Sequence, residues 1–92
     1  MENLTQRVIA VFAAELLTRP ARLSPLTELS EDLQLDPVER AVIGEALEEE
    51  FGIVVGPAAM QFVTIEDAVE FVAHAKALPF VPAYAEMQRL AA

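Results

Sequence analysis

The stretch SEDLQLDPVERAVIGEALEEEFGI, residues 30–53, holds the signals that start and stop a helix. The carboxylate of Asp36 can accept hydrogen bonds from the free amides of a first helical turn. Pro37 then occupies the first helical position, where its missing N–H costs nothing, and Glu39 completes an Asp-x-x-Glu capping box. Gly52 supplies a left-handed stop. We therefore predict a helix that begins directly after Asp36 and ends directly before Gly52.

This predicted helix has two different faces. On a helical wheel, four apolar side chains fall within one arc and are expected to face the core: Ile43, Ala46, Leu47 and Phe51. The opposite arc mixes apolar and acidic side chains: Val38, Ala41, Val42, Glu45, Glu48 and Glu49. The second face therefore combines apolar contact area with negative charge.

The chain before this helix reads as a first helix followed by a long loop. Apolar residues recur at helical spacing: Leu4, Val8, Val11, Phe12 and Leu16. Pro20 and Pro25 then bar continuation of the helix. A loop over residues 24–35 needs inward anchors to stay ordered, and four leucines are the expected ones: Leu26, Leu29, Leu33 and Leu35.

The chain after residue 52 predicts short connections and one more long helix. Residues 53–55 are expected to form an extended link and residues 57–62 a single helical turn. Thr64 and Asp67 form a capping pair, and one apolar stripe follows it: Ile65, Ala68, Val69 and Val72. The pattern predicts an all-α fold, a small four-helix bundle with a long loop after the first helix.

We assign residues 1–76 to this bundle and residues 77–92 to a separate tail. Pro79 and Pro82 break the last helix of the bundle. Beyond them, Tyr84, Met87 and Leu90 can line one side of a short extra C-terminal helix. The tail is expected either to pack back on the bundle or to fray.

Composition describes a folded domain without membrane segments. Apolar residues make up 54% of the 92 residues, and there are only three glycines. The absence of cysteine excludes disulfides, thiolate metal sites and thiol nucleophiles. Acidic and basic residues interrupt the apolar N-terminal patch, and no run approaches the roughly 20 residues of a membrane span. We expect a cytoplasmic protein without membrane insertion.

Negative charge is concentrated in one third of the chain. Nine of the 15 acidic residues lie between residues 28 and 50 with Arg40 as the single opposing base, so this segment carries −8 of the net charge of −9. Such a field repels nucleic acid and anionic lipid, and it favours a basic surface on a protein partner. A solvated acidic face that only keeps the protein soluble is the simpler interpretation of the same charge.

Metal binding and catalysis lack the residues they need. The run from Glu48 to Glu50 is not part of the alternating acidic loop with a central glycine that calcium sites use. His74 is the only histidine, so it has neither a second imidazole nor a thiol to share a metal or a nucleophilic site. We therefore predict no metal, no catalytic residue and no enzymatic activity.

Three segments of the sequence resemble the acyl carrier protein family: EDLQLD, ALEEEFGI and FVTIEDAVEFV. The resemblance extends over residues 4–75 and implies the four-helix bundle already expected from periodicity and caps. In that family, an Asp-Ser-Leu motif opens the second helix, and its serine carries 4'-phosphopantetheine. Counting back from Phe51 without gaps places this motif on Asp36, Pro37 and Val38. Proline has no hydroxyl, so no cofactor is expected at the family's attachment position.

The resemblance also implies a docking face, because the family meets basic partner enzymes through acids of the second helix. Asp36, Glu39, Glu48 and Glu49 match that acidic pattern. Val42 stands where the family has a further glutamate, and Gly44 and Glu45 stand where it has apolar residues. The predicted partner-binding residues are Asp36, Val38, Glu39, Val42, Glu45, Glu48 and Glu49.

Three functional hypotheses follow. The first is a non-catalytic adaptor or regulatory module that serves fatty acid, lipid or polyketide synthesis. The second is a genuine carrier, either represented by a variant whose serine was replaced or loaded at another serine or threonine hydroxyl, of which the chain has six: Thr5, Thr18, Ser24, Thr27, Ser30 and Thr64. The third is a bundle that binds a fatty chain without covalent attachment, lined by Ile43, Leu47, Phe51 and Val69.

Overall fold

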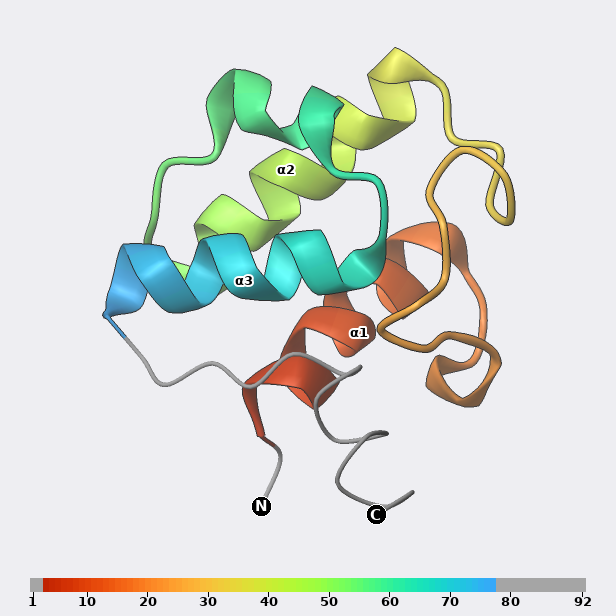
Figure 1. Cartoon of the computed structure of the whole chain (residues 1–92), viewed down its shortest axis with the longest axis horizontal. Helices are drawn as coiled ribbons and strands as arrows, with labels where there is room; N and C mark the ends of the chain where they lie inside the picture. Colours follow the sequence, from red (N-terminus) through yellow and green to blue (C-terminus); the bar gives the residue numbers. More distant parts are fainter. Residues whose placement is uncertain (1–2, 78–92) are drawn as a thin grey trace, which may run out of the picture.

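A computed structural model describes residues 3–77 as a small helical bundle (Figure 1). Its elements are α1 (Leu4–Leu16), η1 (Pro20–Arg22), α2 (Pro37–Phe51), η2 (Gly56–Gln61) and α3 (Ile65–Lys76), where η denotes a 3-10 helix. Within this described range there is no strand, only an isolated bridge between Glu28 and Thr64. The predicted all-α fold with a long first loop is confirmed. The expected extra C-terminal helix lies outside the described residues.

Each α-helix begins with a complete capping box. In each box, a side chain before the helix accepts a hydrogen bond from the amide three residues later, and that third residue's side chain accepts one in return. The three pairs are Asn3 with Gln6, Asp36 with Glu39, and Thr64 with Asp67. The two boxes expected at α2 and α3 are confirmed. Local sequence alone thus places the start of these two helices.

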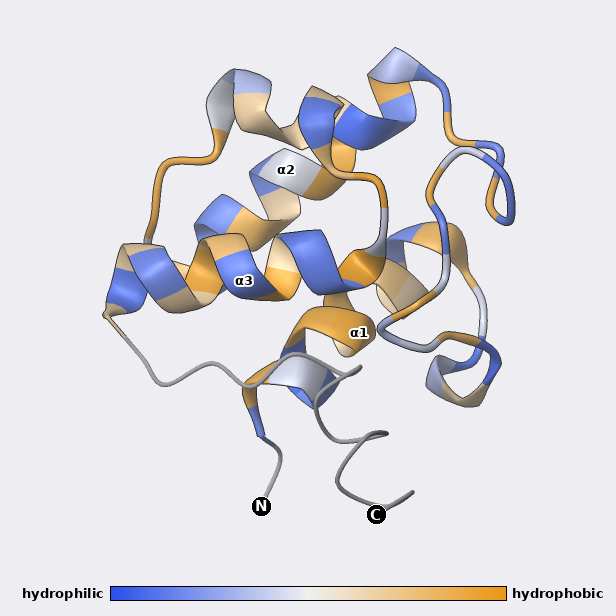
Figure 2. Ribbon diagram, in the orientation of Figure 1, coloured by the Kyte–Doolittle hydropathy of each residue, from blue (hydrophilic) through white to orange (hydrophobic). Residues whose placement is uncertain are grey.

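The core lies where α1 packs against both α2 and α3, while η2 covers a further side of α2. Its largest fully buried side chains are Val8, Phe12, Leu29, Leu47, Ile65 and Val72. Hydrophobic and hydrophilic residues alternate along α3 in the manner of a helix with one buried side (Figure 2). The predicted stripes of all three helices therefore supply the core, with one exception. Ala46 was expected to face the core, but it is half-buried and lines a surface groove between α1 and α2.

The long loop is held by fewer leucines than expected. Leu29 and Leu35 are buried and Leu33 packs against the core, but Leu26 is 49% exposed, so the prediction for Leu26 is wrong. Leu26 lies inside a tight turn in which the Thr27 amide donates to the Ser24 carbonyl oxygen, and this turn presents its side chain to solvent. Leu23, 8% exposed, supplies the missing anchor.

Among the charged residues that the structure describes, only Arg40 is buried, with 9% of its surface exposed. Its Nη1 donates to the carbonyl oxygens of Phe62 and Ala59, at 2.7 and 3.3 Å, and its Nη2 donates to Ser30 Oγ at 2.7 Å. One guanidinium group therefore ties α2 to the long loop and to both η2 and the residue after it. The sequence suggested only a countercharge for the acids at this position.

Replacement of Arg40 by methionine should destabilise the fold. The variant leaves the buried carbonyl oxygens of Ala59 and Phe62 without their donor, which costs about 2 kcal/mol of unfolding free energy. Urea denaturation followed by circular dichroism measures this loss. Arg22→Met, at an exposed position of η1, is the matched control and should stay close to the parent. Equal stability of Arg40→Met and Arg22→Met would show that the guanidinium is not a structural tie.

Candidate functional site

The start of α2 is the position at which the family resemblance places the serine that carries 4'-phosphopantetheine. Pro37 is the first helical residue and is exposed, directly after the capping residue Asp36. Val38 follows with 71% of its surface exposed. This end of α2 thus reaches solvent, but none of its three residues carries a hydroxyl group. A phosphodiester requires such an oxygen, so these residues do not fit a covalently attached phosphate group.

Several of the other hydroxyl groups already serve the fold. Ser30 Oγ accepts the hydrogen bond from Arg40, and Thr64 Oγ1 caps the first turn of α3. Thr27 Oγ1 accepts from the Ser24 amide at 2.9 Å and lies 3.4 Å from Ser24 Oγ. Each of these four oxygens is therefore held by a structural hydrogen bond in the loop or at a cap.

One exposed stripe runs the length of α2. Its members follow at i, i+4, i+7 and i+11, which places them on one side of the helix: Val38, Val42, Glu45 and Glu49. Val42 is 44% exposed. The structure thus brings together four of the seven residues predicted to bind a partner. Asp36 and Glu39 lie at the helix start, where their side chains are engaged in the capping box.

Glu48, the seventh predicted residue, has a structural partner. Its Oε2 accepts hydrogen bonds from the amides of Val55 and Gly56, at 2.8 and 3.0 Å. These two backbone hydrogen bonds, with the Val55 amide the larger cause, lower the pKa of the Glu48 carboxyl below its ordinary value of 4.5. The carboxylate therefore holds the start of η2 against α2, a role that the sequence did not indicate.

A groove lies between α2 and η2 beside the exposed stripe. It has a volume of ≈ 340 Å³ and is lined by Ala41, Gly44, Glu45, Glu48, Gly56, Pro57 and Met60. Beside the groove, η2 lies close to α2 at Gly44. The missing side chain permits this approach, because a Cβ at this position would lie 3.1 Å from the Ala59 Cβ. Met60, 44% exposed, adds apolar surface at the edge of the groove. The exposed stripe and the groove form one continuous surface of apolar and acidic groups.

His74 lies on α3, and 76% of its side chain is exposed. Its Nε2 lies 3.7 Å from Glu70 Oε1, one turn earlier on the same helix. Within residues 3–77, no group of three or more histidine, aspartate or glutamate side chains is placed to hold a metal ion. Nor is any helix in that range long and apolar enough to cross a membrane.

The sequence model of the phosphopantetheine attachment site matches residues 6–72, which is more than half of the chain. The chain belongs to this family. The match spans the described bundle from α1 into α3 and confirms the resemblance to carrier proteins. Domains of the phosphopantetheine attachment family carry a group and are not catalytic in themselves. No curated protein matches the chain.

The two backbone hydrogen bonds that the Glu48 carboxylate accepts make part of the unfolding free energy dependent on pH. Folding lowers the pKa of the Glu48 carboxyl. Its contribution to the unfolding free energy is therefore fully present above the unfolded pKa near 4.5, and it is lost as the pH falls through the lower pKa of the folded state. We expect Glu48→Gln to lower the unfolding free energy most at neutral pH, with the difference from the parent shrinking below about pH 4.5.

Urea denaturation at a series of pH values measures this effect. Glu49→Gln is the matched control, since it removes the same charge from the same turn and leaves the amides of Val55 and Gly56 with their acceptor. A pH-independent difference between Glu48→Gln and the parent would contradict the proposed role of the carboxylate.

Proposed function

We propose that this member of the phosphopantetheine attachment family is a non-catalytic interaction module, an adaptor or regulatory subunit of fatty acid, lipid or polyketide synthesis. In this proposal it carries no 4'-phosphopantetheine at the start of α2. One observation carries the proposal. Pro37 occupies the first helical position, where the family resemblance places the attachment serine, inside a complete capping box.

The local structure supports loss of attachment without loss of fold. A proline at the first helical position gives up an amide that has no partner in a helix, and its fixed φ suits the helix start. The cap supplied by Asp36 and Glu39 is complete, with hydrogen bonds of 2.7 and 3.1 Å. Substitution at this position therefore changes the chemistry of the surface and leaves the orientation of α2 intact.

The exposed stripe of α2 supports a docking role toward a basic protein surface. Exposed ion pairs contribute only about 0.2 to 1 kcal/mol each, so acids alone give weak binding. Val38 and Val42 lie among the acids and offer apolar area that a partner can bury. The predicted interface therefore combines several weak ion pairs with a small apolar centre.

The two alternative functions have less support. Four of the alternative hydroxyls, those of Ser24, Thr27, Ser30 and Thr64, already take part in structural hydrogen bonds. The other two, Thr5 within α1 and Thr18 shortly after it, do not lie at the start of α2. A fatty chain inside the bundle would have to displace packed side chains, because the expected lining residues are at most 4% exposed: Ile43, Leu47, Phe51 and Val69. A natural sequence with serine at position 37 would instead identify this chain as a serine-replaced carrier.

Incubation with coenzyme A and a promiscuous phosphopantetheinyl transferase tests the missing attachment. We expect the intact mass of the protein to stay unchanged, because Pro37 offers no oxygen to accept the phosphopantetheinyl group. Pro37→Ser is the matched control and should gain one arm. Mass gain by the unaltered protein would overturn the proposal, and peptide mapping would then identify the loaded hydroxyl.

Charge reversal on the exposed stripe tests the docking role. We expect Glu45→Lys with Glu49→Lys to lower affinity for purified fatty acid synthesis enzymes with basic carrier-docking surfaces by at least tenfold in biolayer interferometry. Glu48 is left unaltered because it holds η2. The control is Glu70→Lys on α3, outside the stripe. Equal affinity of the parent and the double variant would reject the acidic stripe as the interface.

A further inference from the structure

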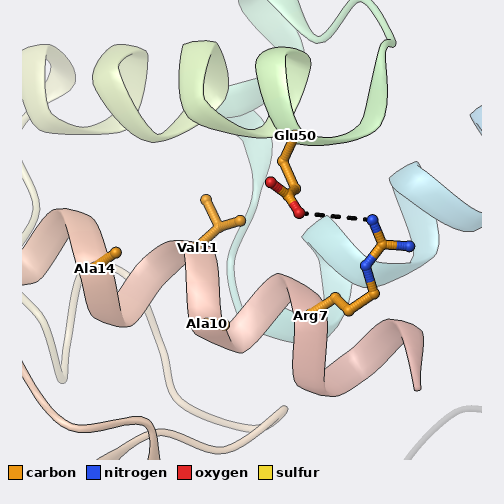
Figure 3. Close-up of a pocket in the computed structure, with 5 residues that line it drawn as sticks. All are labelled: Arg7, Ala10, Val11, Ala14 and Glu50. Carbon is orange, nitrogen blue, oxygen red and sulfur yellow. Dashed lines mark ion pairs between the residues drawn. The ribbon is translucent and has the colours of Figure 1, made fainter. Parts of the chain in front are cut away.

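Two arginine side chains of the structure differ in how their charge is balanced. Arg7 on α1 is exposed, and its Nη2 lies 3.6 Å from Oε1 of Glu50 on α2 (Figure 3). Arg40 is buried, yet it forms no ion pair with any residue from 3 to 77, and its acceptors there are all neutral oxygens. A buried charge needs a counterion more than an exposed charge does, so Arg40 is the place where the structure lacks an anion.

The Arg40 guanidinium also has donor groups that are not used. Arginine carries five N–H groups. Two carbonyl oxygens accept hydrogen bonds from Nη1 and Ser30 Oγ accepts one from Nη2, so three of the five are engaged. Every buried side-chain nitrogen in the described part of the chain has a partner, and Nε has none there, so Nε is open to solvent. Nε and the second N–H of Nη2 can therefore bind a further acceptor.

Ser30 places a nucleophilic oxygen against this guanidinium. Its Oγ lies 2.7 Å from Arg40 Nη2. Ser30 is exposed on the long loop, directly after the buried Leu29. The hydroxyl accepts the hydrogen bond from Arg40 with one lone pair and keeps its own proton and a second lone pair. A group attached to Ser30 Oγ thus has access to solvent and stays within reach of Arg40.

The residues that follow Ser30 favour its recognition by an enzyme with a basic substrate groove. Glu31 and Asp32 come directly after it, and both are exposed. Opposite charge attracts such a segment to a basic protein surface. The same two acids repel a phosphate group on Ser30, but water and salt screen exposed charges, whereas the buried charge of Arg40 is screened much less. The attraction of Arg40 for a phosphate therefore exceeds this repulsion.

We propose that Ser30 is a phosphorylation site and that Arg40 holds the phosphate. Ser30 Oγ attacks the terminal phosphorus of a nucleoside triphosphate, and an Oγ–P bond forms while the bond from that phosphorus to the bridging oxygen breaks. The hydroxyl proton passes to a base of the kinase, and nucleoside diphosphate leaves. The phosphoserine has close to two negative charges and three terminal oxygens, so it balances the charge of Arg40 and accepts from its unused N–H groups.

Phosphorylation would tie the long loop more firmly to α2, because an ion pair with hydrogen bonds replaces one hydrogen bond to a neutral oxygen. Arg40 is two positions from both Val38 and Val42, which places it about 200° around α2 from each. The phosphate therefore leaves the exposed stripe accessible. The modification is independent of the proposed docking role and would regulate the order of the loop.

Phosphoserine incorporated genetically at position 30 of the full-length protein tests the contact with Arg40. A phosphorus nuclear magnetic resonance titration measures the second pKa of the phosphate. A guanidinium beside the phosphate favours the dianion, so we expect Arg40→Met to raise this pKa. Arg22→Met, on the exposed η1, is the matched control and should leave the pKa unchanged. The same phosphate pKa in both variants would overturn the proposal.

Amide hydrogen exchange gives a second readout that needs no substitution of Arg40. The amides of Leu29 and Leu35 donate to the carbonyl oxygens of Val63 and Leu29, so they exchange when the long loop opens. We expect phosphorylation of Ser30 to slow both by about tenfold, the effect of one contact between charged groups. Exchange at an unchanged or faster rate would show that Arg40 does not hold the phosphate.

Incubation with ATP and a serine kinase that prefers acidic residues after the serine tests the acceptor itself. We expect peptide mapping to place one phosphate on Ser30. The phosphate should be lost in Ser30→Ala and retained in Ser24→Ala, a matched exposed serine of the same loop. Phosphate on other hydroxyls alone, or on none, would overturn the assignment of Ser30. The larger mass of phosphopantetheine separates this result from a failure of the proposed function.

Discussion

Arg40 places a guanidinium group in the interior of a small bundle, and the oxygens it binds belong to segments far apart in the sequence. Ser30 lies ten residues before Arg40, and Ala59 and Phe62 lie 19 and 22 residues after it. All three acceptors are neutral, so burial of the charge is tolerable only because its donors meet well-placed oxygens. This one side chain thus links the long loop and η2 to α2, and Glu48 adds a second link at the start of η2.

The acidic face of α2 divides into structural and exposed parts. Asp36 and Glu39 satisfy the amides at the helix start, and Glu48 satisfies the amides of Val55 and Gly56. Glu45 and Glu49 lie on the exposed stripe with Val38 and Val42. A count of acids in the sequence therefore overstates the charge that is free for a partner, because three carboxylates are committed to backbone hydrogen bonds.

Pro37 separates two properties that a helix start usually combines in this family. The cap requires a side-chain acceptor at position 36 and a helical φ at position 37, and both are present. Attachment of phosphopantetheine requires a hydroxyl oxygen at the same place, which proline does not have. A chain can therefore retain the bundle and the orientation of α2 while this surface loses the chemistry of a carrier.

The sequence by itself determined both ends of α2, the start of α3, most of their buried stripes and the lack of a hydroxyl at Pro37. These features depend on residues within one or two helical turns of each other, so local spacing is sufficient to predict them. Only the tertiary structure decided the roles of Arg40 and Glu48, the exposure of Leu26 and the close approach of η2 to α2 at Gly44. The physical reason is distance along the chain. Arg40 and Glu48 bind backbone groups 7 to 22 residues away, and nothing in a linear pattern indicates which carbonyl or amide a folded loop will bring within reach.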